Sequence, residues 1–201
     1  MFIRSERLFL RPIWPEDWQD VFRGIDEPQV VRNLSRAPWP YTPQDARDFA
    51  GMPQDGRCPH FLITRPKGSD GVDIIGVIGL AQMGDEVELG YWIARAHWGQ
   101  GYATEAGRAL LSLVPTLGHR RIVARHFCDN PGSARVLAKL GFRPVGDVSD
   151  AYCVARRSMV PTQMHELVLA AADNCDEPEG GGLGGHPGGD RDGTTPGRRA
   201  A

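Results

Sequence analysis

The chain has 201 residues, of which 41% are hydrophobic and 24% are charged, with a formal net charge of -2. This length and hydrophobic content allow one buried core, and the near-neutral charge gives no reason to expect a nucleic acid or an anionic membrane as partner. No apolar run approaches the roughly 18 residues that a membrane helix needs, and the first residues do not form a signal peptide. We therefore expect a cytoplasmic protein.

Strand and helix patterns alternate along the first 170 residues. The first part predicts a strand over 6–13, a helix over 15–25, a helix over 42–50 with Thr42 as N-cap, and strands over 61–65 and 73–83. The second part predicts a strand over 86–94, a helix from Ala103 that stops before Pro115, a strand over 121–127, a helix over 133–140, and strands near 142–148 and 164–169. This order predicts a mixed sheet with a parallel strand pair, and ligands bind where such strands diverge.

The composition changes near residue 173. The segment 173–201 holds nine of the 25 glycines, six acids against three arginines, and only Cys175, Leu183, Ala200 and Ala201 as apolar residues. Such a segment cannot bury a core. We expect a domain over 1–172 and a disordered Gly-rich tail over 173–201.

The cysteines and histidines predict no metal site and no disulfide framework. Cys58, Cys128, Cys153 and Cys175 are widely spaced without a C-x-x-C pair, and the histidines lack ligand spacing. Because Cys128 lies in an apolar strand pattern, we expect it to be a core residue, and a nucleophile in a two-step mechanism is the alternative.

The segment Trp98–Ala106 places Gly99 and Gly101 between a strand pattern and a helix pattern. Glycine tolerates strained backbone dihedrals and leaves no side chain in the way of a ligand, so successive N–H groups can point at an anion at the positive end of the helix. We expect this loop to hold a diphosphate, and an ordinary strand-to-helix turn is the alternative.

The same loop lacks the residues of two other phosphate-binding motifs. A P-loop needs a lysine after its last glycine, whereas Tyr102, Ala103 and Thr104 follow Gly101 here. A dinucleotide fingerprint needs a third small glycine where Thr104 stands, and an acidic residue about 20 residues later at the end of a second strand. The loop therefore predicts neither motif.

Three segments together resemble the Gcn-related N-acetyltransferase (GNAT) superfamily: 88–93 (ELGYWI), 98–103 (WGQGYA) and 130–142 (NPGSARVLAKLGF). The pyrophosphate loop of that family reads [QR]-x-x-G-x-[GA], which is matched at Gly101 and Ala103. Trp98 departs from the first position and in this resembles the RimJ/RimL-type branch, which acetylates ribosomal-protein N-termini. The resemblance covers roughly residues 1–170. It implies an α/β (α+β layered) fold whose mixed, mostly antiparallel sheet has a central splayed parallel strand pair and flanking helices.

The resemblance also implies a cofactor, acetyl-CoA, as acyl donor in the opening between the parallel strands, and no metal. The contacts that it implies for the cofactor are Ile93, Ala94, Trp98, Gly99, Gly101, Tyr102, Ala103, Thr104, Asn130 and Ser133. Backbone N–H groups near Ile93 and Ala94 would hold the oxyanion of the reaction.

Amide formation from a thioester and an amine needs a neutral nucleophile, a stabilised oxyanion and a leaving thiolate that is protonated. By the two-residue period of a strand, Glu88 shares a face with Gly90, where a glycine lets a substrate approach. Glu88 is therefore the candidate base, directly or through a water. A solvated carboxylate on the sheet face is the alternative.

The helix after Asn130 supplies the candidate acid. Asn130 as N-cap, Pro131 at the first helical position and Gly141 as the stop form a sound capping arrangement, to which the resemblance adds a contact with the pantetheine arm. Many relatives have a tyrosine where Leu137 stands, so the usual acid is missing. Ser133 matches the serine that the ribosomal-protein branch uses near the thiolate, although helix-start preference alone also predicts a serine there.

These expectations describe an enzyme that passes an acetyl group from acetyl-CoA to a primary amine in a ternary complex. A protein N-terminal amine is the first candidate acceptor, and a small-molecule amine is the second. A catalytically silent acyl-CoA-binding or sensing module and a non-enzymatic phosphate-binding domain are the alternatives. We expect no nucleic-acid or membrane partner, and leave the assembly open between a monomer and a homodimer.

Overall fold

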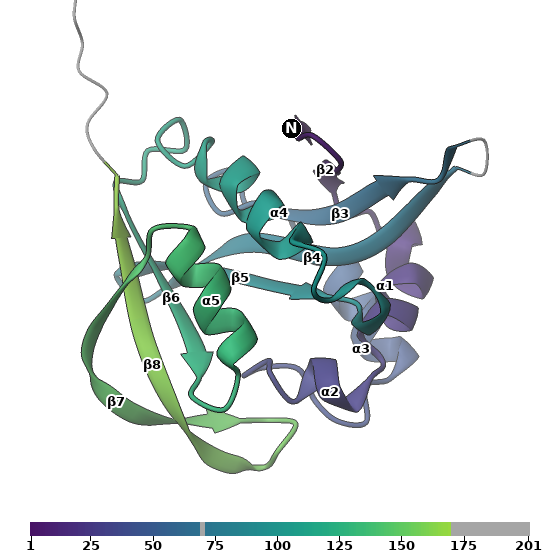
Figure 1. The fold of residues 1–201 in the computed structure, drawn as a ribbon. Helices are drawn as coiled ribbons and strands as arrows, with labels where there is room; N and C mark the ends of the chain where they lie inside the picture. Colours follow the sequence, from purple (N-terminus) through teal and green to yellow (C-terminus); the bar gives the residue numbers. More distant parts are fainter. Residues whose placement is uncertain (69–70, 170–201) are drawn as a thin grey trace, which may run out of the picture. The chain divides into compact units, whose positions relative to one another are not determined.

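The computed structural model describes residues 1–68 and 71–169, which form an eight-stranded sheet with helices on both faces (Figure 1). The strands are Ile3–Arg4 (β1), Phe9–Pro12 (β2), His60–Pro66 (β3), Val72–Met83 (β4), Glu86–Ile93 (β5), Arg121–Phe127 (β6), Arg143–Cys153 (β7) and Ser158–Val168 (β8). The helices are Trp18–Ile25 (α1), Pro28–Val31 (α2), Pro43–Ala50 (α3), Tyr102–Leu111 (α4) and Pro131–Lys139 (α5), with short 3-10 turns at Pro15–Asp17 (η1) and Arg95–His97 (η3).

The strand order is β1-β2-β3-β4-β5-β6-β8-β7, and β5 and β6 are the parallel neighbours in it. The other neighbouring strands pair in antiparallel fashion. The parallel register consists of one residue pair, Glu88 with Val123. Beyond it the two strands point apart, as their arrowheads show in Figure 1. The predicted mixed, mostly antiparallel sheet with a splayed parallel pair is confirmed.

Two hydrophobic cores cover the two faces of this sheet. Because successive strand residues point to opposite faces, Phe61 and Ile63 of β3 lie in one core and Leu62 lies in the other. The first core also contains the buried faces of α4 and α5, including Leu110 and Leu137. The second core contains the buried faces of α1, α2 and α3. The opening between β5 and β6 therefore has a helical layer on each side.

Local sequence signals explain the elements that agree with prediction. Helix α3 begins where Thr42 accepts a hydrogen bond from the Asp45 N–H at 3.2 Å, which is the predicted N-cap. Strand β6 has the predicted bounds, and the ends of β3, β4, β5, α4 and α5 lie within about three residues of the predicted ones.

The differences lie at the two ends of the sheet. The strand expected over 6–13 is β2, which begins at Phe9 because a turn in which the Ser5 N–H donates to the Leu8 carbonyl separates it from β1. Strands β7 and β8 run much further than predicted because they pair with each other there, and Tyr152 and Met159 on them are exposed. The tail expected over 173–201 lies outside the described residues. Among the described helices, none is long and apolar enough to cross a membrane.

Candidate active site

The loop between β5 and α4 has the geometry of an anion cradle. Gly99 and Gly101 have φ angles of +76° and +83°, a region that side chains rarely adopt. Gly101 is the N-cap of α4, and no side chain caps this helix. The first helical bond of the loop runs from the Glu105 N–H to the Gly101 carbonyl at 3.1 Å. The N–H groups of Tyr102, Ala103 and Thr104 thus have no partner within the helix and are free to bind an anion.

Two contacts fix this loop to the rest of the domain. The Trp98 Nε1–H donates to the Ile93 carbonyl at 2.6 Å, which ties the start of the loop to the end of β5. Arg7 pairs with Glu105 at 2.7 Å and donates to the Gln100 carbonyl at 3.2 Å. Trp98 stands where the GNAT motif has arginine or glutamine, and in this chain its indole holds the loop in place.

Two arginines, each ion-paired with a carboxylate, lie beside the first residue of α4. The Tyr102 ring lies 4.7 Å from the Arg7 guanidinium, and its hydroxyl lies 3.5 Å from Arg65. Burial lowers the pKa of the neighbouring His97, the charge of Arg65 lowers it further, and the charge of Asp73 opposes this decrease. The side chains of Tyr102 and Thr104 are themselves buried, so these two residues can offer a ligand their backbone N–H groups.

The two backbone N–H groups at the end of β5, those of Ile93 and Ala94, point in opposite directions. The Ala94 N–H donates to the Ile75 carbonyl at 2.8 Å, so it is engaged by β4 and is not available to an oxyanion in this structure. Because the N–H groups of an antiparallel strand alternate between its two neighbours, the Ile93 N–H points to the other side, where β6 has diverged. Of the two expected oxyanion donors, Ile93 therefore has the suitable direction.

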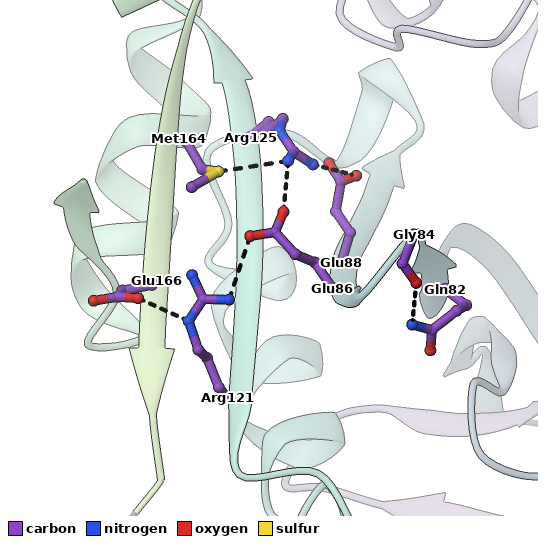
Figure 2. A network of polar contacts seen from close by, with 8 residues as sticks. All are labelled: Gln82, Gly84, Glu86, Glu88, Arg121, Arg125, Met164 and Glu166. Atoms are coloured by element: carbon purple, nitrogen blue, oxygen red, sulfur yellow. Dashed lines mark hydrogen bonds and ion pairs between the residues drawn. The ribbon is translucent and has the colours of Figure 1, made fainter. Parts of the chain in front are cut away.

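Glu88 lies in a network of ion pairs between β5 and β6 (Figure 2). Arg125 on β6 donates to Glu88 Oε2 at 2.9 Å and to Glu86 Oε2 at 2.8 Å, and Arg121 bridges Glu86 to Glu166. The Glu88 side chain is 19% exposed. Glu88 is thus neither a freely solvated carboxylate nor an isolated one. Sequence reasoning missed Arg125. It lies 37 residues after Glu88, and only the pairing of β5 with β6 brings the two side chains together.

Glu88 faces the helical layer of α1 and α3. Trp92 shares the Glu88 face by the two-residue period of a strand and belongs to the core of that layer. Leu89, on the opposite face, belongs to the core under α4 and α5. Gly90 shares the Glu88 face, and a Cβ placed on it would meet no atom within 4 Å. The open space beside Glu88 supports the expectation that a substrate can approach there.

The first turn of α5 lies on the other side of the opening. Asn130 Oδ1 accepts the Ser133 N–H at 3.1 Å, which confirms Asn130 as the N-cap, and Gly141 has the expected left-handed conformation. The Ser133 Oγ lies 2.8 Å from the Tyr91 hydroxyl of β5. Leu137, where many relatives have a tyrosine, is 1% exposed and packs in the core. Sequence reasoning missed the contact between Tyr91 and Ser133.

Capping by Asn130 has a measurable energetic consequence. Asn130→Ala should lower the free energy of unfolding by about 1 kcal/mol, because the Ser133 N–H loses its acceptor. Chemical denaturation measures this value. Asn130→Asp retains a capping oxygen and should stay close to wild type. Equal stability of all three proteins would contradict the capping role.

Cys128 corrects one expectation. It is exposed and follows the end of β6, where its N–H donates to the Pro161 carbonyl. The apolar pattern of β6 ends at Phe127, so Cys128 is not a core residue as we expected. Cys58 and Cys153 are buried free thiols. Over residues 1–68 and 71–169, no three side chains of His, Cys, Asp or Glu gather as metal ligands would.

The splayed parallel pair with a glycine loop near its end is the arrangement expected of a GNAT fold. The family model of the acetyltransferase (GNAT) domain matches residues 7–143. The chain belongs to this family, whose members use acetyl-CoA. The residues present fit that cofactor, because the uncapped N–H groups of α4 and the arginines beside them suit a pyrophosphate.

Several known proteins are similar to the chain. An uncharacterized N-acetyltransferase of Bacillus subtilis, YoaA, is 31% identical over 170 residues, which are 83% of this chain and 96% of that protein. A ribosomal-protein-serine acetyltransferase of Escherichia coli is 35% identical over 74 residues, or 35% of this chain and 41% of that protein.

Two solved structures share the fold. RimL, a ribosomal L7/L12 alpha-N-protein acetyltransferase in complex with coenzyme A, has a TM-score of 0.69 at 20% identity, over 84% of this chain and 98% of its own. Spermidine N-acetyltransferase of Vibrio cholerae, in complex with CoA and spermine, has a TM-score of 0.66 at 17% identity, over 81% of this chain and 95% of its own.

Proposed function

We propose that this acetyltransferase transfers acetyl from acetyl-CoA to the N-terminal amine of a protein, by direct attack in a ternary complex. The observation that carries the proposal is the opening between β5 and β6, which has Glu88 on one face and Ser133 on the other. Glu88 can then accept a proton from an amine on one side of the sheet, and Ser133 can donate a hydrogen bond to a leaving thiolate on the other. We assign the activity to residues 1–172 and its location to the cytoplasm.

The loop residues hold the donor in this proposal. The N–H groups at Gly99, Gly101, Tyr102, Ala103 and Thr104 bind the pyrophosphate, and Trp98 keeps the loop against β5. Asn130 and Ser133 at the start of α5 face the pantetheine arm. Acetyl-CoA supplies the acetyl thioester when bound.

Glu88 accepts the proton of the amine, directly or through one water. Arg125 fixes the direction of its carboxylate through Oε2, and Oε1 lies outside this network. The Ile93 N–H, which points into the opening, stabilises the negative charge that develops on the carbonyl oxygen.

The choice of acceptor rests on the similarity to the ribosomal-protein-serine acetyltransferase, which covers 74 residues of this chain. A small-molecule amine is the second candidate, because a spermidine N-acetyltransferase has the same fold. A catalytically silent acyl-CoA-binding module is the third.

An acceptor screen with acetyl-CoA and detection of released thiol tests the proposal. We expect faster turnover with short peptides that carry a free N-terminal serine than with polyamines or free amino acids. The same peptides with a blocked N-terminus and one internal lysine serve as the control and should not react. Reaction with polyamines alone would replace the proposed acceptor. CoA binding with no thiol release from any acceptor would favour the silent module.

A further inference from the structure

Tyr91 and Ser133 meet across the opening although they are 42 residues apart. Tyr91 lies three positions beyond Glu88, where the parallel register of β5 and β6 ends. Its ring packs against the core under α4 and α5, and its hydroxyl reaches the first turn of α5, 2.8 Å from Ser133 Oγ. The part of β5 that no longer pairs with β6 is thus connected to α5 by two hydroxyl groups.

The direction of this hydrogen bond follows from burial. Burial raises the pKa of Tyr91 to about 12, so the phenol keeps its proton at neutral pH. In the described part of the chain, Ser133 is the hydrogen-bond partner of the Tyr91 hydroxyl. If Ser133 donated instead, the proton of this partly buried phenol would have no acceptor among the described residues, which is costly. The favourable arrangement has Tyr91 donating to Ser133 Oγ.

A hydroxyl that accepts from one side keeps its own proton for another acceptor. The Ser133 N–H is already bound by Asn130, so backbone and side chain of Ser133 are both fixed. With the Tyr91 bond in place, the remaining Ser133 proton can turn toward the opening. We propose that Tyr91 is a positioning residue that aims the Ser133 hydroxyl proton at the sulfur atom of the leaving group. This inference rests on the proposed function, in which that sulfur lies in the opening.

The step balances without a proton from Tyr91. The bond between the amine nitrogen and the carbonyl carbon forms, and the bond between that carbon and sulfur breaks. The electron pair of the broken bond goes to sulfur, and the amine proton goes to Glu88 or its water. The thiolate accepts a hydrogen bond from Ser133 and later takes a proton from solvent. Because the pKa of a thiol is roughly 8.5, the thiolate can leave when it is stabilised by this hydrogen bond, without a complete proton transfer.

The test measures the pKa of the CoA thiol in its complex with the protein, by the ultraviolet absorbance of the thiolate after subtraction of the free protein. A hydrogen bond to a charged group should lower this pKa by about one pKa unit in the wild type relative to free CoA. Tyr91→Phe and Ser133→Ala should each abolish most of this decrease. Tyr152→Phe, at an exposed tyrosine of β7, is the matched control and should leave it unchanged. Melting curves verify that each variant is folded.

Coupling between the two residues distinguishes positioning from a general effect of the ring. In the Ser133→Ala background, Tyr91→Phe should change neither the thiol pKa nor the turnover further, and Ser133→Thr should retain much of the effect. With an active acceptor, Tyr91→Phe should lower kcat about tenfold and leave the KM for acetyl-CoA within about a factor of two. An unchanged thiol pKa in a folded Tyr91→Phe variant that binds CoA would overturn the inference. Failure of the wild type to bind CoA would overturn the proposed function instead.

Discussion

Glu88→Gln should lower turnover by roughly 10² to 10⁴, because it removes the acceptor of the amine proton and nearly conserves the shape of the side chain. The affinity for CoA should stay within about a factor of three, since the phosphate loop is untouched. In the variant, activity should recover as rising pH supplies the free amine without a base. Steady-state kinetics across pH, together with calorimetry of CoA binding, measure both effects.

Glu86→Gln is the matched control for this prediction. Glu86 has the same chemistry, is two residues away on the same strand face and binds the same Arg125. If the loss in Glu88→Gln came from a broken ion-pair network, Glu86→Gln would show a similar loss. We expect less than a threefold change for it. Wild-type turnover and an unchanged pH profile in Glu88→Gln would remove Glu88 as the base.

Gly101→Val should weaken CoA binding by at least tenfold. The φ of +83° at this position is strained for a β-branched side chain, and the new methyl groups would stand over the N–H groups that begin α4. Calorimetric titration with CoA measures the change in Kd.

The control for Gly101→Val must carry the same backbone strain elsewhere. Gly146 has a φ of +65° in β7, and a Cβ added there would meet no atom within 4 Å. Gly146→Val should lower the melting temperature and leave the CoA affinity unchanged. If both variants bind CoA as the wild type does, the loop is an ordinary turn and the phosphate site lies elsewhere.

Much of the fold could be predicted from local signals, because its central elements bury one side of a regular pattern. The capped helix after Thr42 and the strand 121–127 have clear periodicity and punctuation. The outer hairpin of β7 and β8 lacks such a regular pattern. Val148, Tyr152 and Met159 are exposed there, so backbone pairing to a distant segment, and not an apolar face, determines its length.

The site could be predicted only where its residues are adjacent in the sequence. The glycine loop and the Asn130 cap lie within single segments, so spacing was sufficient to predict the left-handed glycines and the helix cap. Arg125 beside Glu88 and Tyr91 beside Ser133 depend on how β5, β6 and α5 come together in space. A partial signal existed for Tyr91, since the two-residue period of β5 places it opposite to the Glu88 face.

The single register pair between Glu88 and Val123 gives this sheet two strand edges in its interior. Edges normally lie at the outside of a sheet, where water exchanges with their amides and other chains can pair with them. The backbone amides of Tyr91 and Ile93 should therefore exchange hydrogen for deuterium faster than those of β4, although they lie between two hydrophobic layers. A ligand with amide groups of its own can occupy this gap as a short extra strand, and these two amides should become protected when it does.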